Sequence, residues 1–345
     1  MNNVEYLIVG QGLAGTMLAF EMLDRGISFQ LVSSPQKSKA SLVAAGMVNP
    51  LVFKRLTKSW QVDELLPFMK KRYRELEKIL NSHFYFDKTI LKPLSAQEML
   101  LWKERQNDPG FQDYISEVSE YTGIPGIRPA AAYGKVSGAG FLSLSDFLSQ
   151  AETYFQKKGL LTEGLIDPSE LPFNSESIGI KAEKIIFCEG YHLHKNPLFD
   201  FVKMNPAKGE VLLIHAPELS DDYILNKQVF VLPVGDHHFK VGSTYEWEDL
   251  TEQTTQEGKD SILQRLENLI QVDYEVVNHW AGVRPTISDR RPVLGLHPDI
   301  KNVFVFNGLG TKGVMLAPKM ASVFCDFLTI HNYTLPKEID VNRFK

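Results

Sequence analysis

The chain opens with a pattern of apolar positions that predicts a β-α-β unit. Residues 4–9 form a short run of β-branched and aromatic character that glycines follow at once, which is typical of a buried parallel strand. Helical spacing of apolar residues then runs from Leu13 to Asp24, where the following Gly26 predicts the helix end. Residues 27–33 predict a second strand. Such a unit crosses over right-handedly onto a parallel sheet.

A different pattern follows in the middle of the chain. The apolar spacing over residues 60–80 predicts a long amphipathic helix with its charges on the outer face. Beyond that helix, short apolar runs separated by tight polar turns, such as the turn at residues 235–238, predict an antiparallel sheet from two separated stretches of sequence. These runs are residues 84–86, 90–94, 223–225, 229–233, 239–241 and 274–280.

Helices and strands of the parallel type recur later in the chain. Residues 144–158 and 256–269 predict helices, and residues 184–188 and 302–306 predict buried strands that glycines follow. Because the parallel-type strands are scattered, we expect two discontinuous domains. They are a nucleotide-binding domain of residues 1–80, 136–203 and 281–345, and an inserted antiparallel domain of residues 81–135 and 204–280.

Composition and charge limit the class of protein. Of the 345 residues, 43% are hydrophobic and 23% are charged, as in an ordinary globular protein with room for two packed domains. The formal net charge of −5 leaves no excess of Lys and Arg to attract phosphate backbones, so nucleic acid is a disfavoured partner. No apolar run reaches the roughly 18 residues of a membrane-spanning helix, so we expect no membrane span.

Cysteine and histidine usage favours neither disulfides nor a metal site. Cys188 and Cys325 lie far apart within apolar runs, which is typical of buried thiols in a reducing cytosol, and we expect a cytoplasmic protein. His192 and His194 could belong to a metal site, but no second pair of ligands at a matching spacing accompanies them. We therefore expect a loop there and no metal.

The chemistry begins at the loop between the first strand and the first helix. Gly10, Gly12 and Gly15 form the pattern G-x-G-x-x-G, in which the first glycine permits a tight turn and the second lets a pyrophosphate approach the backbone. The third allows close packing, and the helix N-terminus faces the anion. The position of the pattern between strand and helix predicts a dinucleotide site rather than a merely structural turn.

The ribose end of that site departs from the usual pattern. An acidic residue ordinarily ends the second strand and binds the adenosine ribose, but Ser33 and Ser34 stand there. A serine hydroxyl can hydrogen-bond to a ribose but offers no charge-assisted contact. We therefore expect an intact phosphate end and a weakened ribose end.

Five further motifs carry a family resemblance. They are residues 40–50 (ASLVAAGMVNP), 187–190 (FCEG), 206–211 (PAKGEV), 280–285 (WAGVRP) and 307–318, which include Gly-Leu-Gly-Thr-Lys-Gly. In this order the motifs resemble the D-amino-acid oxidase and glycine oxidase family of FAD-dependent oxidoreductases over nearly the full length. The resemblance implies a mixed α/β plus α+β protein. Its FAD-binding domain would be Rossmann-like, of the glutathione-reductase type, and would carry an inserted antiparallel-sheet substrate domain.

The resemblance also implies which residues hold FAD. Small residues suit the segment beside the flavin ring, since a backbone that lies against a planar ring cannot carry bulky side chains. The implied cofactor residues are Gly10, Gly12, Leu13, Ala14, Gly15, Ser33, Ser34, Ser41, Ala44, Ala45, Gly46, Met47, Glu189, Gly190, Gly308, Gly310, Thr311, Lys312, Gly313 and Val314.

Arg284, Tyr245 and Lys312 are the implied catalytic residues. In the family, the arginine that Arg284 matches binds the substrate carboxylate. Its place at the end of an apolar strand agrees, because an unpaired guanidinium there is costly and its planar donors suit a carboxylate. The alternative is a structural ion pair with Asp289 or Glu246. Tyr245 would wall the substrate pocket, and Lys312 would bring positive charge near the flavin.

The implied reaction is oxidation of a small amino acid or N-substituted glycine by hydride transfer to the flavin, followed by hydrolysis of the imine. The partners would be a carboxylate-bearing amine, oxygen or another electron acceptor, and possibly a second copy of the chain. Relatives that oxidise amino acids carry arginine and asparagine where Thr311 and Lys312 stand here. Three alternatives stay open: a 2-hydroxy-acid dehydrogenase with a histidine base, an oxidase domain for carboxymethylaminomethyl-uridine in tRNA, and a non-catalytic flavin-binding protein.

Overall fold

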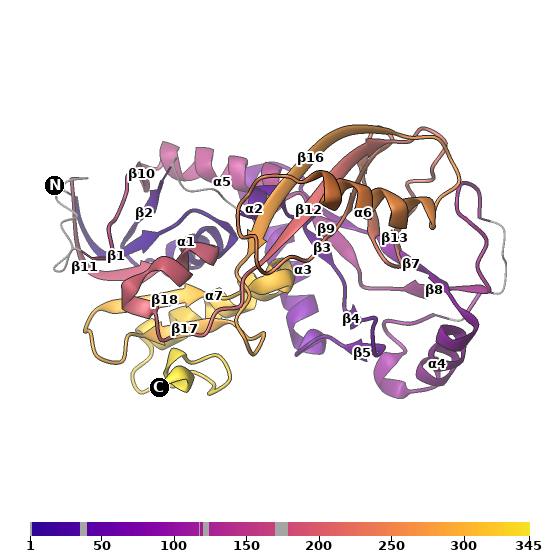
Figure 1. The fold of residues 1–345 in the computed structure, drawn as a ribbon. Coiled ribbons are helices and arrows are strands. Elements are labelled where there is room, and N and C mark those ends of the chain that lie inside the picture. Colours follow the sequence, from indigo (N-terminus) through magenta and orange to yellow (C-terminus); the bar gives the residue numbers. More distant parts are fainter. Residues whose placement is uncertain (1, 35–39, 117, 120–123, 170–178) are drawn as a thin grey trace.

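The chain builds two large β-sheets, seen side by side in Figure 1. The computed structural model describes residues 2–34, 40–116, 118–119, 124–169 and 179–345. Both ends of the drawn chain lie beside the sheet that contains the N-terminal strand (Figure 1). Within the described ranges, no helix is long and apolar enough to cross a membrane.

The first sheet has six strands in the order β10-β2-β1-β11-β18-β17, and every neighbouring pair is parallel except β17 and β18. The predicted β-α-β unit is confirmed as β1, α1 (Leu13–Asp24) and β2. The strands of this sheet are β1 (Asn2–Val9), β2 (Phe29–Ser33), β10 (Leu161–Glu163), β11 (Ile180–Phe187), β17 (Val293–Leu296) and β18 (Val303–Asn307).

The second sheet has seven strands in the order β16-β12-β15-β14-β13-β7-β8. It is antiparallel except where β13 pairs parallel with β7, two strands from distant segments, as a parallel pair requires because no hairpin can join it. Its strands are β7 (Thr89–Leu94), β8 (Ala132–Val136), β12 (Ala207–His215), β13 (Tyr223–Asn226), β14 (Phe230–Gly235), β15 (His238–Gly242) and β16 (Glu275–Arg284).

Small sheets join the two large ones. The strand predicted at residues 84–86 does not enter the seven-stranded sheet, because β6 (Tyr85–Asp87) and β3 (Met47–Val48) both pair with β9 (Gly140–Leu142). A hairpin of β4 (Leu51–Val52) and β5 (Thr57–Lys58) follows β3. The segment that follows α2 (Ala40–Val43) is therefore fixed between the large sheets.

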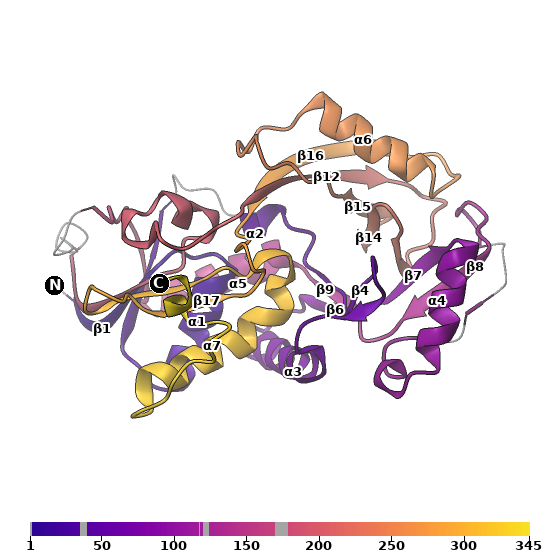
Figure 2. The same cartoon turned by 60° about the horizontal axis from the view of Figure 1, so that its bottom comes forward.

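The remaining helices cover the sheets. The amphipathic patterns are confirmed by α3 (Val62–Leu80), α5 (Leu144–Lys157) and α6 (Gln256–Glu267), and α6 lies over β12 and β16 in Figure 2. We did not predict α4 (Ala96–Gln106), although Ser95 and Glu98 form a capping box at its start. Short 3₁₀ turns occupy residues 109–111, 190–195, 197–199, 310–312 and 341–344.

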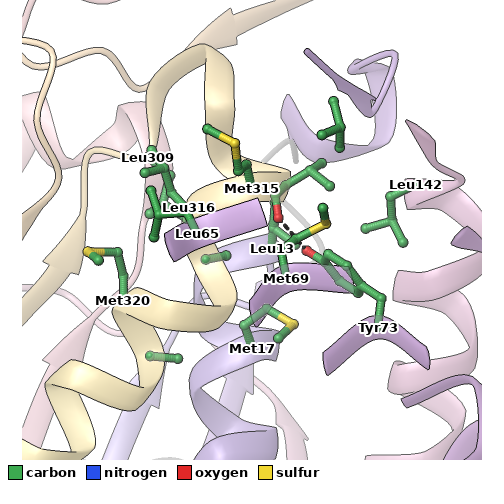
Figure 3. Packing of buried hydrophobic residues seen from close by; sticks show 14 of the residues in the cluster. Leu13, Met17, Leu65, Met69, Tyr73, Leu142, Leu309, Met315, Leu316 and Met320 are labelled. Carbon is green, nitrogen blue, oxygen red and sulfur yellow. Dashed lines mark hydrogen bonds between the residues drawn. The ribbon is translucent and has the colours of Figure 1, made fainter. Parts of the chain in front are cut away.

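A buried apolar cluster packs three helices against one another. Side chains of α1, α3 and α7 (Gly313–Thr329) interdigitate there, including Met17, Met69 and Met320 (Figure 3). The buried Tyr73 hydroxyl donates a 3.0 Å hydrogen bond to the Val314 carbonyl at the start of α7. The cluster therefore fixes the N-terminus of α7 relative to the glycine loop that begins α1.

Both cysteines are buried free thiols, as the sequence predicts. Burial raises the pKa of Cys188 well above its ordinary value and that of Cys325 to about 12. Neither thiol is therefore a ready nucleophile.

Candidate cofactor and substrate site

One cavity of about 470 Å³ collects the predicted site residues from both large sheets. It runs from the carboxyl ends of β1, β2 and β11 to the strands β12, β15 and β16. Ligands of parallel sheets bind outside the carboxyl ends of the strands. The lining includes Arg284, Tyr245 and every predicted cofactor residue except Gly15 and Gly308.

The three glycines of the first loop have three separate steric roles. A Cβ on Gly10, whose φ is +111°, would lie 2.5 Å from the Cys188 carbonyl oxygen, and one on Gly15 would lie 1.9 Å from the Gly10 carbonyl oxygen. A Cβ on Gly12 would meet only the Ser41 hydroxyl, at 3.6 Å. Gly10 and Gly15 are therefore needed for the loop itself, whereas Gly12 keeps open the space into which a pyrophosphate would fit.

The ribose end also contains an unsatisfied group. Ser33 ends β2 as a buried residue of the cavity lining. The Ser34 hydroxyl is buried too, and within the part of the chain that the structure describes it has no hydrogen-bond partner. Since buried hydroxyls are ordinarily paired, the Ser34 hydroxyl fits a ligand that can hydrogen-bond to it.

The segment beside the expected ring is held by its small residues. Gly46 has a φ of +73°, and a Cβ there would lie 2.0 Å from the Leu142 carbonyl oxygen of β9. Met47 pairs with Phe141 in the same small sheet. The Ser41 hydroxyl accepts a 3.3 Å hydrogen bond from the Leu13 N–H at the start of α1. These contacts place the 41–47 backbone along one wall of the cavity.

The C-terminal loop supplies another part of the lining. Gly310, Thr311, Gly313 and Val314 reach the cavity. Gly308 does not, and a Cβ there would lie 2.5 Å from Ile287 Cγ1, so this glycine permits packing behind the wall. Gly308 and Gly15 thus support the site without facing the cavity.

Lys312 is a lysine of the C-terminal loop whose ammonium pairs with no carboxylate of the described residues. Its Nζ donates to the Asn49 carbonyl at 2.6 Å, to the Ser59 hydroxyl at 2.7 Å and more weakly to the Leu51 carbonyl. No ion pair among the described residues includes it, and burial lowers its pKa to about 8. Lys312 therefore ties the C-terminal loop to residues 49–59, and the charge of its ammonium is left unbalanced.

Arg284 ends β16, and its guanidinium lies between Gly209 and the ring of Tyr245. On one side, a Cβ on Gly209 would come within 2.0 Å of Nη2, so only glycine leaves room for the guanidinium. On the other side, the Tyr245 ring centroid lies 4.2 Å from the guanidinium carbon. This stacking orients the planar group and adds a cation–π contact.

The hydrogen-bond partners of Arg284 are all uncharged. Nη2 donates to the Ser243 hydroxyl at 2.6 Å and to the Thr244 carbonyl at 3.2 Å, and Nη1 donates to the carbonyls of Lys208, at 3.1 Å, and Ala207, at 3.4 Å. Burial lowers the pKa of the guanidinium. Neutral acceptors orient a cation but do not balance its charge.

The structural alternatives for Arg284 are wrong. Asp289 pairs with Arg343 instead, at 2.7 Å. One carboxylate oxygen of Glu246 accepts hydrogen bonds from the backbone N–H groups of Trp247 and Glu248. Across the described ranges, no carboxylate pairs with Arg284.

Sequence reasoning missed part of the lining. The hairpin of β13 and β14 contributes Asn226, Gln228 and Phe230, and β15 is followed by Ser243. The hairpin residues carry no local signal, because pairing of distant strands brings them to the cavity. In the described part of the chain, no group of three or more His, Cys, Asp or Glu could hold a metal ion.

Comparison with known proteins agrees with this geometry. Residues 5–327 match a family model described as FAD dependent oxidoreductase (DAO). A glycine oxidase from Pseudomonas aeruginosa is 25% identical in an alignment of 353 positions, which covers 94% of this chain and 94% of that protein. Two solved structures share the fold. Glycine oxidase from Geobacillus kaustophilus has a TM-score of 0.77 at 18% identity, over 98% of this chain and 97% of its own. Iminodiacetate oxidase from Chelativorans sp. BNC1 has a TM-score of 0.79 at 20% identity, over 97% of this chain and 98% of its own.

Proposed function

This chain belongs to the DAO family of FAD-dependent oxidoreductases, and from that premise we propose that it oxidises the C–N bond of a small amino acid or an N-substituted glycine. FAD is its cofactor. The names of the relatives support the choice of substrate class, since they include a glycine oxidase and an iminodiacetate oxidase. We further propose that residues 1–80, 136–203 and 281–345 hold FAD, and that residues 81–135 and 204–280 form the substrate domain.

The observation that carries the proposal is the uncompensated charge of Arg284. Its guanidinium lines the same cavity as the cofactor loop, is oriented by four neutral acceptors, and is paired with no carboxylate of the described chain. A cation in that setting is stabilised by an anion that arrives with the substrate. A carboxylate on the substrate meets this need.

The residues of the chain would then bind and orient rather than exchange protons. Bound FAD supplies the hydride acceptor. Arg284 would hold the carboxylate, and Tyr245 would keep the guanidinium in its plane. Fixing the carboxylate limits the motion of the neighbouring carbon, and positioning of this kind can lower a barrier by about 7–11 kcal/mol. Water would then hydrolyse the imine product.

A substrate panel tests the proposed reaction. We expect the visible flavin absorbance to bleach under anaerobic conditions with glycine or N-methylglycine, and to respond less to bulky D-amino acids. Peroxide release in air and reduction of an artificial dye would distinguish oxygen from another electron acceptor. A holoprotein whose flavin no amine bleaches would contradict the proposal.

The panel should include 2-hydroxy acids, because one histidine of the described chain, His192, lines the cavity. A dehydrogenase of hydroxy acids needs a base of this kind close to the flavin. Bleaching by a 2-hydroxy acid in place of its amino analogue would favour that function. We place the reaction in the cytoplasm, in keeping with the two buried free thiols.

Replacing Ser33 with glutamate should tighten FAD binding. The carboxylate would restore the charge-assisted hydrogen bond to the ribose that family members ordinarily make, and we expect an increase in affinity of about 3-fold to 10-fold. Titration of apoprotein with FAD, followed by flavin fluorescence, measures the dissociation constant. Ser33→Gln is the matched control without charge. Equal affinities of the two variants would mean that the missing carboxylate does not weaken the ribose end.

A further inference from the structure

Two charged side chains of β12 lie on the face of the sheet away from the cavity. Gly209 and Val211 line the cavity, so the alternation of a strand turns Lys208 and Glu210 to the other face, which α6 covers (Figure 2). Lys208 is 1% exposed and Glu210 is 3% exposed. Lysine is almost never buried to this degree unless it is paired.

The partner of the buried lysine belongs to the segment that follows β15. Lys208 Nζ lies 2.5 Å from Asp249 Oδ2 and 4.0 Å from Glu210 Oε1. The hydrogen bond from Lys208 lowers the pKa of Asp249 to about 2, so this carboxyl group is ionised at ordinary pH. Glu210 has partners of its own, since its carboxylate accepts from the N–H and the hydroxyl of Thr255 before α6.

Backbone hydrogen bonds hold the same segment along the start of β12. The Lys208 N–H donates to the Glu246 carbonyl at 2.8 Å, and the Glu246 N–H donates back to the Lys208 carbonyl at 3.0 Å. The Glu210 N–H donates to the Thr244 hydroxyl at 2.9 Å. Residues 243–249 are therefore attached to β12 by two backbone bonds, one side-chain bond and the ion pair at Asp249.

The residues that aim Arg284 are in this segment or on its partner strand. Ser243 and Thr244 supply the acceptors of Nη2, and Tyr245 supplies the stacked ring. The Lys208 carbonyl accepts both from the Glu246 N–H and from Arg284 Nη1. A displacement of residues 243–249 would thus change two acceptors and the ring that covers the guanidinium.

We infer that Lys208 is a positioning residue for the substrate-carboxylate site. From the far side of the sheet, its ammonium fixes residues 243–249 through Asp249, and these residues in turn fix the plane and direction of Arg284. The inference rests on the proposed function, because it takes Arg284 as the group that binds the substrate carboxylate. It assigns Lys208 no contact with substrate or cofactor.

Lys208→Met and Asp249→Asn holoenzymes test this assignment. We expect the KM for N-methylglycine to rise about 10-fold to 100-fold in each, because a displaced guanidinium binds the carboxylate less well, and kcat to fall by a smaller factor than KM rises, because the flavin itself is not moved. The dissociation constant of acetate, a bare carboxylate probe read from the flavin spectrum, should rise in parallel. The double variant should raise the KM and the acetate dissociation constant no further than Lys208→Met does, since the two changes remove the same contact.

A second buried pair provides the matched control. Lys92 on β7 is 5% exposed and lies 2.8 Å from Glu98, and neither residue lines the cavity. Lys92→Met should lower stability as a structural pair does, yet leave the KM and the acetate affinity unchanged. If Lys92→Met changed the KM and the acetate affinity as much as Lys208→Met does, the effect would be general destabilisation and the inference would be wrong.

Failure of the inference and failure of the proposed function are distinguishable. If Lys208→Met does not fold, Asp249→Asn carries the test, because the Asp249 side chain is 40% exposed and its amide can be solvated. An unchanged KM and unchanged acetate affinity in Asp249→Asn would overturn the inference alone. A wild-type holoprotein that neither oxidises amino acids nor binds acetate would overturn both.

Discussion

The Gly12→Ala protein is expected to fold normally and to bind FAD about 10-fold to 100-fold more weakly than the wild type. Gly12 has a φ of −86° and extended backbone, which alanine adopts without strain. The added methyl group would make only an ordinary contact with Ser41, at 3.6 Å. It would, however, occupy the space that the pyrophosphate needs, and overpacking of this kind costs about 1–3 kcal/mol. Flavin fluorescence during titration of the apoprotein measures the loss.

Gly15→Ala distinguishes damage to the loop itself from loss of the space for the pyrophosphate. The methyl group there would lie 1.9 Å from the Gly10 carbonyl oxygen, so this variant should lower the melting temperature of the apoprotein as well as the affinity for FAD. Gly12→Ala apoprotein should melt with the wild type. If Gly12→Ala apoprotein also melted early, the loss of FAD would reflect a damaged loop, and the assignment of Gly12 to the pyrophosphate would lose its support.

The N-terminal half of the site was predictable because its signals are local. Strand, glycine loop and helix follow one another within the first 24 residues, and the spacing of the three glycines is read there directly, although the neighbour that restricts Gly10 is the distant Cys188 carbonyl after β11. The same holds for the C-terminal loop, where Gly310 lies just before α7 and Gly313 begins it. Motifs of this kind carry their geometry in the sequence, since turn and helix start need particular residues at fixed spacing.

The substrate half was less predictable because long-range pairing assembles it. Asn226 and Phe230 reach the cavity only because β13 and β14 join strands from distant segments. Lys208 is the clearest example of a residue whose role the sequence alone does not predict. In the sequence it is one lysine among 37 basic residues, and only the register of β12 with β16, together with the bridge to Glu246, makes it a buried cation behind Arg284. Burial of a charged residue follows from tertiary structure, not from local pattern.

The structure also narrows the possible partners of Arg284. Sequence reasoning required a carboxylate partner, which could come from the substrate, Asp289 or Glu246. The structure removes both protein candidates and adds four neutral acceptors that hold the guanidinium in place. An arginine oriented in advance loses less conformational freedom when a carboxylate arrives, which strengthens binding.

Arg284→Ala should therefore produce the largest kinetic effect, a fall in kcat/KM of about 30-fold to 3,000-fold for N-methylglycine. Removing one partner of a desolvated charge pair costs about 2–5 kcal/mol, and each 1.4 kcal/mol is tenfold. The loss should be much smaller for an amine of similar size without a carboxylate, such as ethylmethylamine. Arg284→Lys keeps the charge but not the planar donors, so we expect an intermediate value.

Arg343→Ala is the matched control for that result. Arg343 is also stacked on an aromatic ring, that of Phe344, and is paired with Asp289, one of the two alternative partners that the sequence offered for Arg284. Its removal should leave kcat/KM within about twofold, because Arg343 lies outside the cavity lining. Steady-state rates for both amines in all three variants make the comparison. Equal losses for N-methylglycine and ethylmethylamine in Arg284→Ala would show that the arginine does not recognise the carboxylate.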